Sequence, residues 1–244
     1  MKAVLPKLKN NVAHLGEDAS ISVLCGGKTL YRNQSLNEYV FILASQLVPK
    51  AFERLSIIYN PWQIIPHFFE WDYIIDRFRD NKAYDKTLNR YKEWGLNKIC
   101  MMDFSVFYSD PEERQLKNME TNFERAIYAQ EKGFEIIFNY NNILDIEYND
   151  CFPENLGTMI IDDTHSETKW FYRENIALRK LLQITKIEDV IFLSGKKTLQ
   201  HRSGMLKILK DQGVMIHVIP SQWEAIGLWQ KQKKDTRNAE ALQH

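Results

Sequence analysis

The sequence predicts an α/β protein built on a mostly parallel sheet, and three observations lead to that prediction. Short apolar segments alternate with longer amphipathic segments along the 244 residues. The apolar segments are rich in Val, Ile, Met and Phe on both faces, which is typical of parallel strands covered by helices. No break in composition and no internal repeat divides the chain. We therefore expect one α/β domain over residues 1–230 and a polar tail over residues 231–244.

Seven apolar segments are predicted strands. They cover residues 20–25, 55–59, 98–103, 134–138, 158–162, 189–193 and 214–219, with 3–5 as a candidate eighth strand. Connections between parallel strands are right-handed, which leaves two architectures. One is a (β/α) barrel of the TIM type, complete or distorted, and the other is an open doubly wound sheet. Seven detectable strands in a chain of this length favour the barrel-like architecture.

The amphipathic segments are predicted helices that pack on the strands. They cover residues 37–52, 71–78, 82–94, 110–132, 170–184 and 198–212. In the second of these segments, Trp71, Ile74, Ile75 and Phe78 follow the i, i+3, i+4, i+7 spacing of one helix face. The longest segment is followed by Gly133, a residue type that is common just after a helix end.

Composition excludes several classes of protein. Lys and Arg total 32, as do Asp and Glu, so no global positive field holds nucleic acid, although a local basic groove remains open. The apolar runs are too short to cross a bilayer, and the first residues lack the apolar core of a signal peptide. Three cysteines are too few and too scattered for a disulfide framework or a zinc ribbon. We therefore expect a soluble, cytoplasmic protein without a membrane partner.

Acidic residues at strand ends are the first candidates for chemistry. The carboxyl ends of parallel strands meet at one edge of a sheet, where the following loops open. Asp103 ends the third predicted strand, and Asp162 and Asp163 follow the fifth. Such carboxylates can hold a hard cation such as Mg²⁺ or act as acid and base, and His165 on the same loop could carry a proton. The structural alternative is that Asp163 caps the next helix and His165 is exposed.

Amide, aromatic and basic residues follow other predicted strands. Asn139 and Asn141 follow the fourth strand, and Trp223 beyond the last strand could stack on a nucleobase or simply pack. Lys196 and Lys197 follow a glycine and precede a predicted helix, an arrangement that suits one phosphate, although a turn with solvated lysines is the alternative. The glycine spacing of a Walker A loop is absent, as are the radical-SAM cysteine motif, Gly-x-Gly-x-x-Gly, Gly-x-Ser-x-Gly and His-Glu-x-x-His.

Four short stretches between residues 66 and 140 form a distinctive set. They are Phe-Phe-Glu-Trp-Asp-Tyr at 68–73, Asp-Phe-Ser-Val-Phe at 103–107, Asn122 with Arg125, and Gly-Phe-Glu-Ile-Ile at 133–137. Together they resemble an uncharacterised family of phage and mobile-element proteins, from whose pattern the chain departs after Ile137. The resemblance implies a phage or mobile-element origin. It also implies that the site includes Asp72, Asp103, Ser105, Asn122 and Arg125.

These observations leave two main hypotheses for function. The first is a phage or mobile-element enzyme that acts on a nucleotide, or on a base within nucleic acid, with Asp103 as general base or nucleophile. In it, Asp162 and Asp163 position a metal or the substrate, and the two lysines hold phosphate. The second is a non-catalytic factor that binds nucleic acid or a host protein, such as a replication accessory factor or an inhibitor. A metal-dependent nuclease is a third, simpler alternative.

Overall fold

The fold is that of a computed structural model, which describes most of the chain. The described residues are 5–15, 19–25, 28–31, 38–69, 72–106, 109–140, 151–162, 171–193 and 200–219. Of residues 20, 22–25, 28–31 and 72, the backbone alone is described. The predicted polar tail lies outside the described residues. Within the described part, no helix is both long enough and apolar enough to span a membrane.

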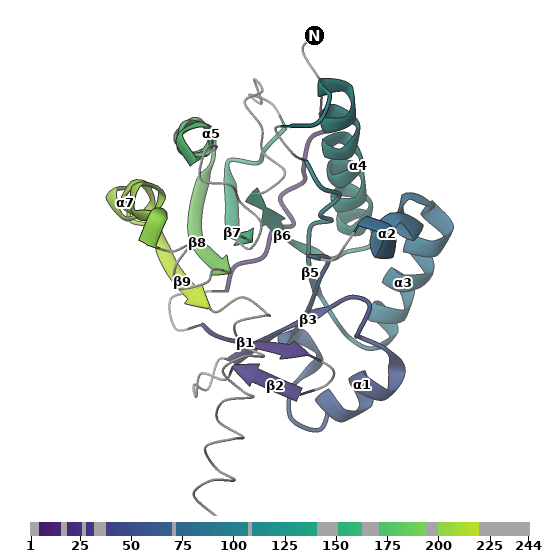
Figure 1. The fold of residues 1–244 in the computed structure, drawn as a ribbon. Helices are drawn as coiled ribbons and strands as arrows, with labels where there is room; N and C mark the ends of the chain where they lie inside the picture. Colours follow the sequence, from purple (N-terminus) through teal and green to yellow (C-terminus); the bar gives the residue numbers. More distant parts are fainter. Residues whose placement is uncertain are drawn as a thin grey trace, which may run out of the picture.

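Strands and helices alternate over most of the chain (Figure 1). The strands are β1 (Ser20–Cys25), β2 (Lys28–Tyr31), β3 (Glu38–Leu43), β4 (Ile64–His67), β5 (Lys98–Cys100), β6 (Glu135–Asn139), β7 (Asn155–Asp162), β8 (Lys186–Leu193) and β9 (Met215–Ile219). The α-helices are α1 (Pro49–Leu55), α2 (Asp72–Ile75), α3 (Asn81–Glu93), α4 (Glu112–Glu131), α5 (Phe171–Ile184) and α7 (Ser203–Asp211). Two 3₁₀ turns, η1 (Pro61–Gln63) and η2 (Asp76–Arg79), precede β4 and α3.

The described strands form two hydrogen-bonded sheets. One has the order β5-β6-β7-β8-β9 and is parallel throughout. The other has the order β2-β1-β3-β4, in which β1, β3 and β4 are parallel and β2 is antiparallel to β1. The mostly parallel α/β class that the sequence predicts is confirmed. A closed barrel is not shown, because no ladder joins β4 to β5 or β9 to β1 in the described chain, although each of these pairs is in contact.

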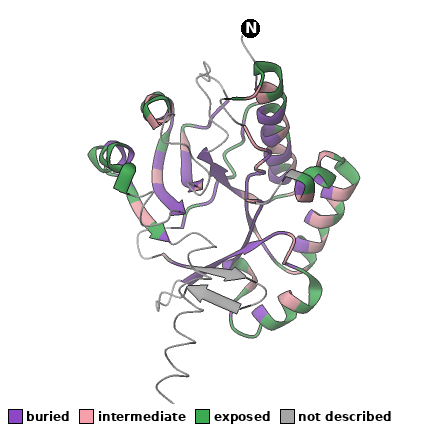
Figure 2. Ribbon diagram, viewed as in Figure 1, coloured by how far each residue is buried: buried purple, intermediate pink, exposed green. Residues whose placement is uncertain are grey.

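Two apolar clusters lie on opposite faces of the strands. The outer cluster packs the strands against the helices, which lie outside them and turn their exposed faces to solvent (Figure 2). The inner cluster draws side chains from both sheets. Its members on the strands are Ile21, Tyr39, Phe41, Ile65, Cys100, Ile137, Ile160, Ile191, Leu193 and Ile219. Side chains alternate along a strand, so a residue two positions beyond an inner residue also faces inward.

The segment 11–15 lies between β6 and β7. The Ala13 amide donates to Ile136 (3.0 Å), and the Thr158 amide donates to the Ala13 carbonyl (2.8 Å). Gly157 has φ +64°, and a Cβ atom built there would lie 2.5 Å from the Ala13 oxygen, so the close approach requires glycine. The buried side chain of Gln130 accepts from the Lys9 amide (2.9 Å) and donates to the Lys9 carbonyl (2.8 Å), which anchors the preceding residues to α4.

Three sequence predictions in the first third of the chain are wrong. Residues 37–52, predicted as one helix, contain β3 and the start of α1 instead. Residues 55–59, predicted as a strand, are the end of α1 and a turn, and η1 (Pro61–Gln63) follows them. The strand β4 was not predicted. The physical reason is that β3 is buried on both faces, and a short run of buried Tyr, Val, Phe and Ile has no period that separates a strand from a helix.

The remaining predictions agree with the structure more closely. The predicted strands at 20–25, 134–138, 158–162, 189–193 and 214–219 are β1, β6, β7, β8 and β9. The strand predicted at 98–103 stops at Cys100, and residues 101–103 continue as a loop. The candidate strand at 3–5 falls largely outside the described residues, and Leu5 is not in a strand.

Candidate site at the carboxyl ends of the strands

Polar side chains from four neighbouring strands face one edge of the molecule. His67 ends β4, Asn139 ends β6 and Asp162 ends β7, each two positions beyond an inner-cluster isoleucine. They therefore face inward at the carboxyl ends of their strands. Asp103 follows β5, which lies between β4 and β6 in space. We call these four residues the carboxyl-edge cluster.

Asp103 is held by the amide of Asn139. The Asn139 Nδ2 atom donates to Asp103 Oδ1 at 2.7 Å, and Asn139 is fully buried whereas Asp103 is half-buried. A hydrogen bond to an ionised acceptor is short and strongly directional. Cys100 lies below this pair, where burial first, and then the charge of Asp103, raises the pKa of its thiol. The carboxylate is thus oriented at the rim of a dry interior.

The loop after β5 is fixed by two asparagines of α4. The Asn122 side chain accepts from the Phe104 amide (2.9 Å) and donates to the Phe104 carbonyl (3.0 Å). Asn118 donates to the carbonyl of Ser105 (2.7 Å). Asn122 is fully buried, so its carboxamide replaces the strand partner that this loop lacks. The loop cannot move without breaking these bonds, and Asp103 is therefore preorganised.

Arg125 joins α4 to η2 and α3 through its hydrogen bonds. Its guanidinium donates to the Asn81 side chain and to the Arg79 carbonyl (2.9 Å), and it lies 5.8 Å from the ring centroid of Tyr84. Arg79 in turn donates to Asn118 (2.9 Å). The asparagine and arginine of the resemblance therefore support the site loop and the helices behind it.

His67 was missed by the sequence analysis. It is 5% exposed, and it packs against the rings of Phe41 and Phe69. Within the described part of the chain, no hydrogen bond reaches its Nδ1 atom. Burial lowers the pKa of the imidazole to about 3, so the ring is neutral at neutral pH. The signal that could have found it is the run Ile64-Ile65 before a proline and a histidine, which is typical of an edge strand.

The structure places the other predicted residues unevenly. Asp162 is half-buried at the end of β7, and Asp72 begins α2. Ser105 is half-buried, with its carbonyl bound to α4. Six predicted residues lie outside the described residues, namely Asn141, Asp163, His165, Lys196, Lys197 and Trp223.

A second polar cluster joins α5 and α7 to the end of β6. Arg202 is 2% exposed, forms an ion pair with Glu174, and lies 3.7 Å from the ring centroid of Phe171. The Tyr140 hydroxyl donates to the Glu174 carbonyl. Arg202 therefore does not contribute to a basic groove on the surface, because its charge is buried and paired inside the protein.

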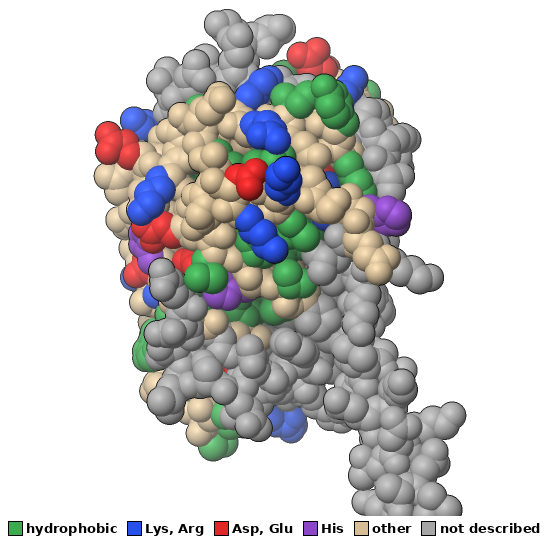
Figure 3. Space-filling view, turned by 90° about the vertical axis from the view of Figure 1, so that its left-hand side faces the viewer, with side chains coloured by type: hydrophobic (Ala, Val, Ile, Leu, Met, Phe, Trp, Pro, Cys, Tyr) green, Lys and Arg blue, Asp and Glu red, His purple; other side chains and the backbone are tan. Residues whose placement is uncertain are grey.

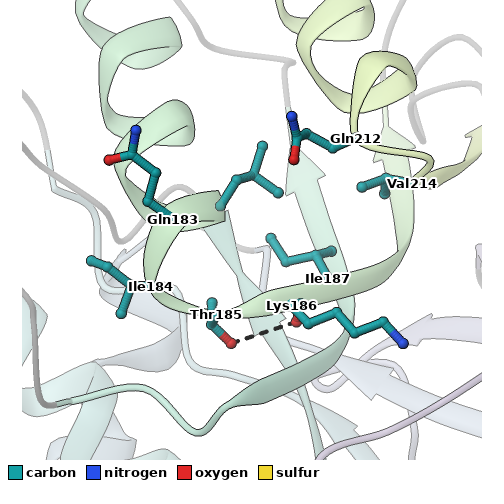
Figure 4. Close-up of a pocket in the computed structure, with 8 residues that line it drawn as sticks. Gln183, Ile184, Thr185, Lys186, Ile187, Gln212 and Val214 are labelled. Carbon is teal, nitrogen blue, oxygen red and sulfur yellow. Dashed lines mark hydrogen bonds between the residues drawn. The ribbon is translucent and has the colours of Figure 1, made fainter.

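A hollow at the opposite edge of the molecule carries no comparable chemistry (Figure 4). It is lined by the end of α5, the start of β8 and the residues after α7. The Thr185 hydroxyl, one of its polar groups, donates to the Pro153 carbonyl (2.7 Å) and is satisfied by the backbone. In the described part of the chain, no group of three or more His, Cys, Asp or Glu side chains could hold a metal ion.

Comparison with known proteins adds no relative. Neither a family model, nor a curated protein, nor a solved structure matches this chain. The fold and the carboxyl-edge cluster therefore carry the functional argument.

Proposed function

We propose that the protein is a phage or mobile-element enzyme that acts on a nucleotide, or on a base within nucleic acid. The observation that supports this most is the Asp103 carboxylate, held at 2.7 Å by buried Asn139 at the carboxyl ends of parallel strands. In α/β proteins this edge is where ligands bind and where catalytic residues gather. A carboxylate fixed in position lowers the cost of reaching a reactive geometry.

The proposed roles follow from the positions of the residues. Asp103 acts as general base or nucleophile, and Asn139 positions it. Asp162 faces the same edge and positions the substrate or a Mg²⁺ ion, whose preferred ligands are oxygen atoms. In the sequence, Asp163 and His165 follow β7, and we assign them substrate positioning and proton transfer.

The lysine pair and the aromatic residue complete the proposal. Lys196 and Lys197 follow β8 in the sequence and would bind the phosphate of the nucleotide. Asn141 follows β6, and Trp223 follows β9, where an indole ring can stack on a base.

The experiment is a direct search for product. The purified protein is incubated with nucleotides and with single- and double-stranded DNA, with and without Mg²⁺, and the products are resolved by mass spectrometry. Asp103→Asn should lower the rate at least about 100-fold, the scale of a lost general base. Asp211→Asn is the matched control, because Asp211 is exposed at the end of α7 and distant from the carboxyl edge. Full activity in folded Asp103→Asn and Asp162→Asn would refute the enzyme proposal.

A non-catalytic nucleic-acid-binding factor is the second candidate, and one surface favours it. Lys and Arg side chains gather on the face formed by α5 and α7 (Figure 3). Exposed cations on these helices are Arg173, Arg179, Lys180, Lys207 and Lys210. Such a face suits a phosphate backbone.

This second candidate has its own test. The double variant Lys207→Gln, Lys210→Gln should weaken binding to a short DNA duplex and reduce the salt dependence of that binding. DNA binding that depends on these lysines, with no chemical product and no effect of Asp103→Asn, would favour the binding factor over the enzyme.

A further inference from the structure

The imidazole of His67 has an unsatisfied hydrogen-bonding atom. The residue is 5% exposed, and its Nδ1 atom has no hydrogen-bond partner among the residues that the structure describes. Native proteins pair nearly all buried polar atoms, because a buried group without a partner loses its bonds to water and gains none. An exception at the carboxyl ends of parallel strands points to a partner that arrives from outside.

The position of His67 aims it at the proposed site. It shares the inner face of β4 with Ile65, one pleat closer to the carboxyl edge. The next strand in space is β5, which leads into Asp103. The His67 ring lies 5.2 Å from the ring centroid of Phe69 and 6.5 Å from that of Phe41. Aromatic faces and one buried, unpaired nitrogen thus lie on the strand next to the one that leads into Asp103.

The charge state of His67 selects the kind of ligand. Since burial keeps its pKa at about 3, the ring is neutral and offers one donor and one acceptor nitrogen. A neutral ring gives a phosphate no counter-charge. It does match the edge of a heterocyclic base, which alternates donors and acceptors as an amide does. Phe69 is partly buried and offers a face on which a base can stack.

We propose that His67 is a specificity-determining residue, whose Nδ1 binds the hydrogen-bonding edge of a nucleobase stacked on Phe69, beside Asp103 and Asn139. This inference rests on the proposed function, because it names the part of the substrate that the carboxyl-edge cluster recognises. The base, rather than the sugar or the phosphate, is then the group that the described residues select.

Binding measurements with matched ligands test the inference. The ligands are adenosine, guanosine, cytidine, thymidine, ribose and a short single-stranded DNA, titrated into the full-length chain. A nucleoside should bind at least about tenfold more tightly than ribose, because one buried hydrogen bond is worth about that ratio. His67→Phe keeps the ring and loses the nitrogens, and should bind that nucleoside about tenfold more weakly.

Two controls separate a binding role from a structural one. His67→Asn keeps a polar atom near the position of Nδ1 and should restore affinity to within about threefold of the unmodified chain. His201→Phe changes an exposed histidine before α7 and should bind as the unmodified chain does. Without ligand, His67→Phe should melt at the same or a higher temperature than the unmodified chain, because the unpaired nitrogen is gone.

A measurement on the unmodified chain keeps the inference testable if the variants do not fold. The ¹⁵N resonance of His67 Nδ1 should move when the nucleoside binds. Unchanged affinity in His67→Phe, an unmoved resonance in the bound state, or equal affinity for ribose would overturn the inference. If Asp103→Asn still abolished turnover in that case, the proposed function would stand without it. If neither the nucleosides nor the DNA bound, both would fail.

Discussion

Neutral amides hold the polar edge of this molecule at the scale of single residues. Asn139 orients Asp103, and Asn122 pairs both backbone groups of Phe104. A carboxamide carries a donor and an acceptor together, so it satisfies buried backbone without bringing a net charge into the core. The reactive candidate is an acid, but the residues that place it are uncharged.

Removing the Asn122 clamp should loosen the loop that carries Asp103. Asn122→Ala deletes two hydrogen bonds to buried backbone atoms, and we expect a loss of about 2–4 kcal/mol in the free energy of unfolding. The Phe104 amide should also exchange its hydrogen faster. Urea denaturation and hydrogen exchange measure the two effects. Asn89→Ala, on an exposed face of α3, should cost less than about 0.5 kcal/mol, and an equal cost for both variants would contradict the clamp.

His67 should make the protein sensitive to acid. Its pKa is about 3 in the folded state and 6.5 for the free group, so between these values the unfolded chain binds the extra proton. The free energy of unfolding therefore keeps its full value above pH 6.5. Below pH 6.5 it falls by up to about 1.4 kcal/mol for each pH unit, because the unfolded chain takes up a proton that the folded chain does not. Denaturant titrations from pH 7 to about pH 4 should give a shallower slope for His67→Gln.

The comparison for this pH dependence is a variant that removes no titratable group. Asn89 is exposed on α3, so Asn89→Ala should keep the slope of the unmodified chain. Identical slopes for the unmodified chain and His67→Gln would show that His67 is protonated in the folded state.

Single residues differ in how well sequence alone indicates their role. Asp103 stands out because an acid closes an apolar run, and the structure does place it at a strand edge. Asn122 and Arg125 are indicated as site residues only by the family resemblance. In the structure, Asn122 binds the loop after β5, and Arg125 binds the residues that lead into α3. The sequence carries a signal for the strand that ends at His67, but the burial of its side chain could not be inferred, because that burial depends on packing between elements that are distant in sequence.

At the scale of elements, backbone hydrogen bonds hold the segment 11–15 between β6 and β7. Its carbonyl and amide groups take up backbone partners that the two strands would otherwise share directly. Glycine at position 157 makes this possible, since its left-handed backbone and missing side chain let the Ala13 oxygen approach. The contact is one of backbone with backbone, so the sequence pattern gives no sign of it.

A pair of glycine variants separates the two requirements at position 157, which are a positive φ and space for the Ala13 oxygen. Gly213 has a similar φ of +70° but nothing within 4 Å of a built Cβ atom, so Gly213→Ala should cost about 1–2 kcal/mol. Gly157→Ala meets the same backbone penalty and a 2.5 Å contact with backbone, so it should cost at least about 2 kcal/mol more. Thermal denaturation compares them, and equal costs would mean that the segment can shift away.

The elements themselves were predictable where their periodicity was clear. Helices α3, α4 and α5 show a polar face, and Gly133 and Gly213 mark the turns that precede β6 and β9. The β3 region fails this test, because all six of its residues are buried. Burial on every side removes the polar positions from which a period is read. If residues 37–52 are interpreted as a helix, the sequence pattern offers no neighbouring strand with which the short strand β4 can pair.

At the scale of the whole molecule, one layer of strands separates two apolar clusters. The inner cluster contains Cys100 and the outer cluster contains Cys151, and both side chains are buried. The same strands contribute alternate side chains to each cluster, so unfolding of one cluster also disrupts the packing of the other. We expect the described core to unfold as one cooperative unit.

Thiol labelling tests this cooperativity. In a Cys25→Ser variant, Cys100 and Cys151 should react with a thiol reagent at the same rate as denaturant is raised, because both become accessible in one transition. Their rates are read separately by mass spectrometry of peptides. Labelling of Cys151 well before Cys100 would show that the outer cluster opens alone.

The insertion of segment 11–15 between β6 and β7 also sets an order of events during synthesis. Gln130, whose side chain binds the backbone of Lys9, leaves the ribosome 121 residues after Lys9. The segment 11–15 therefore stays unpaired until β6 and β7 have been synthesised. A fusion partner attached ahead of this segment would have to move with it during assembly. We therefore expect a tag at the C-terminal end to disturb assembly less.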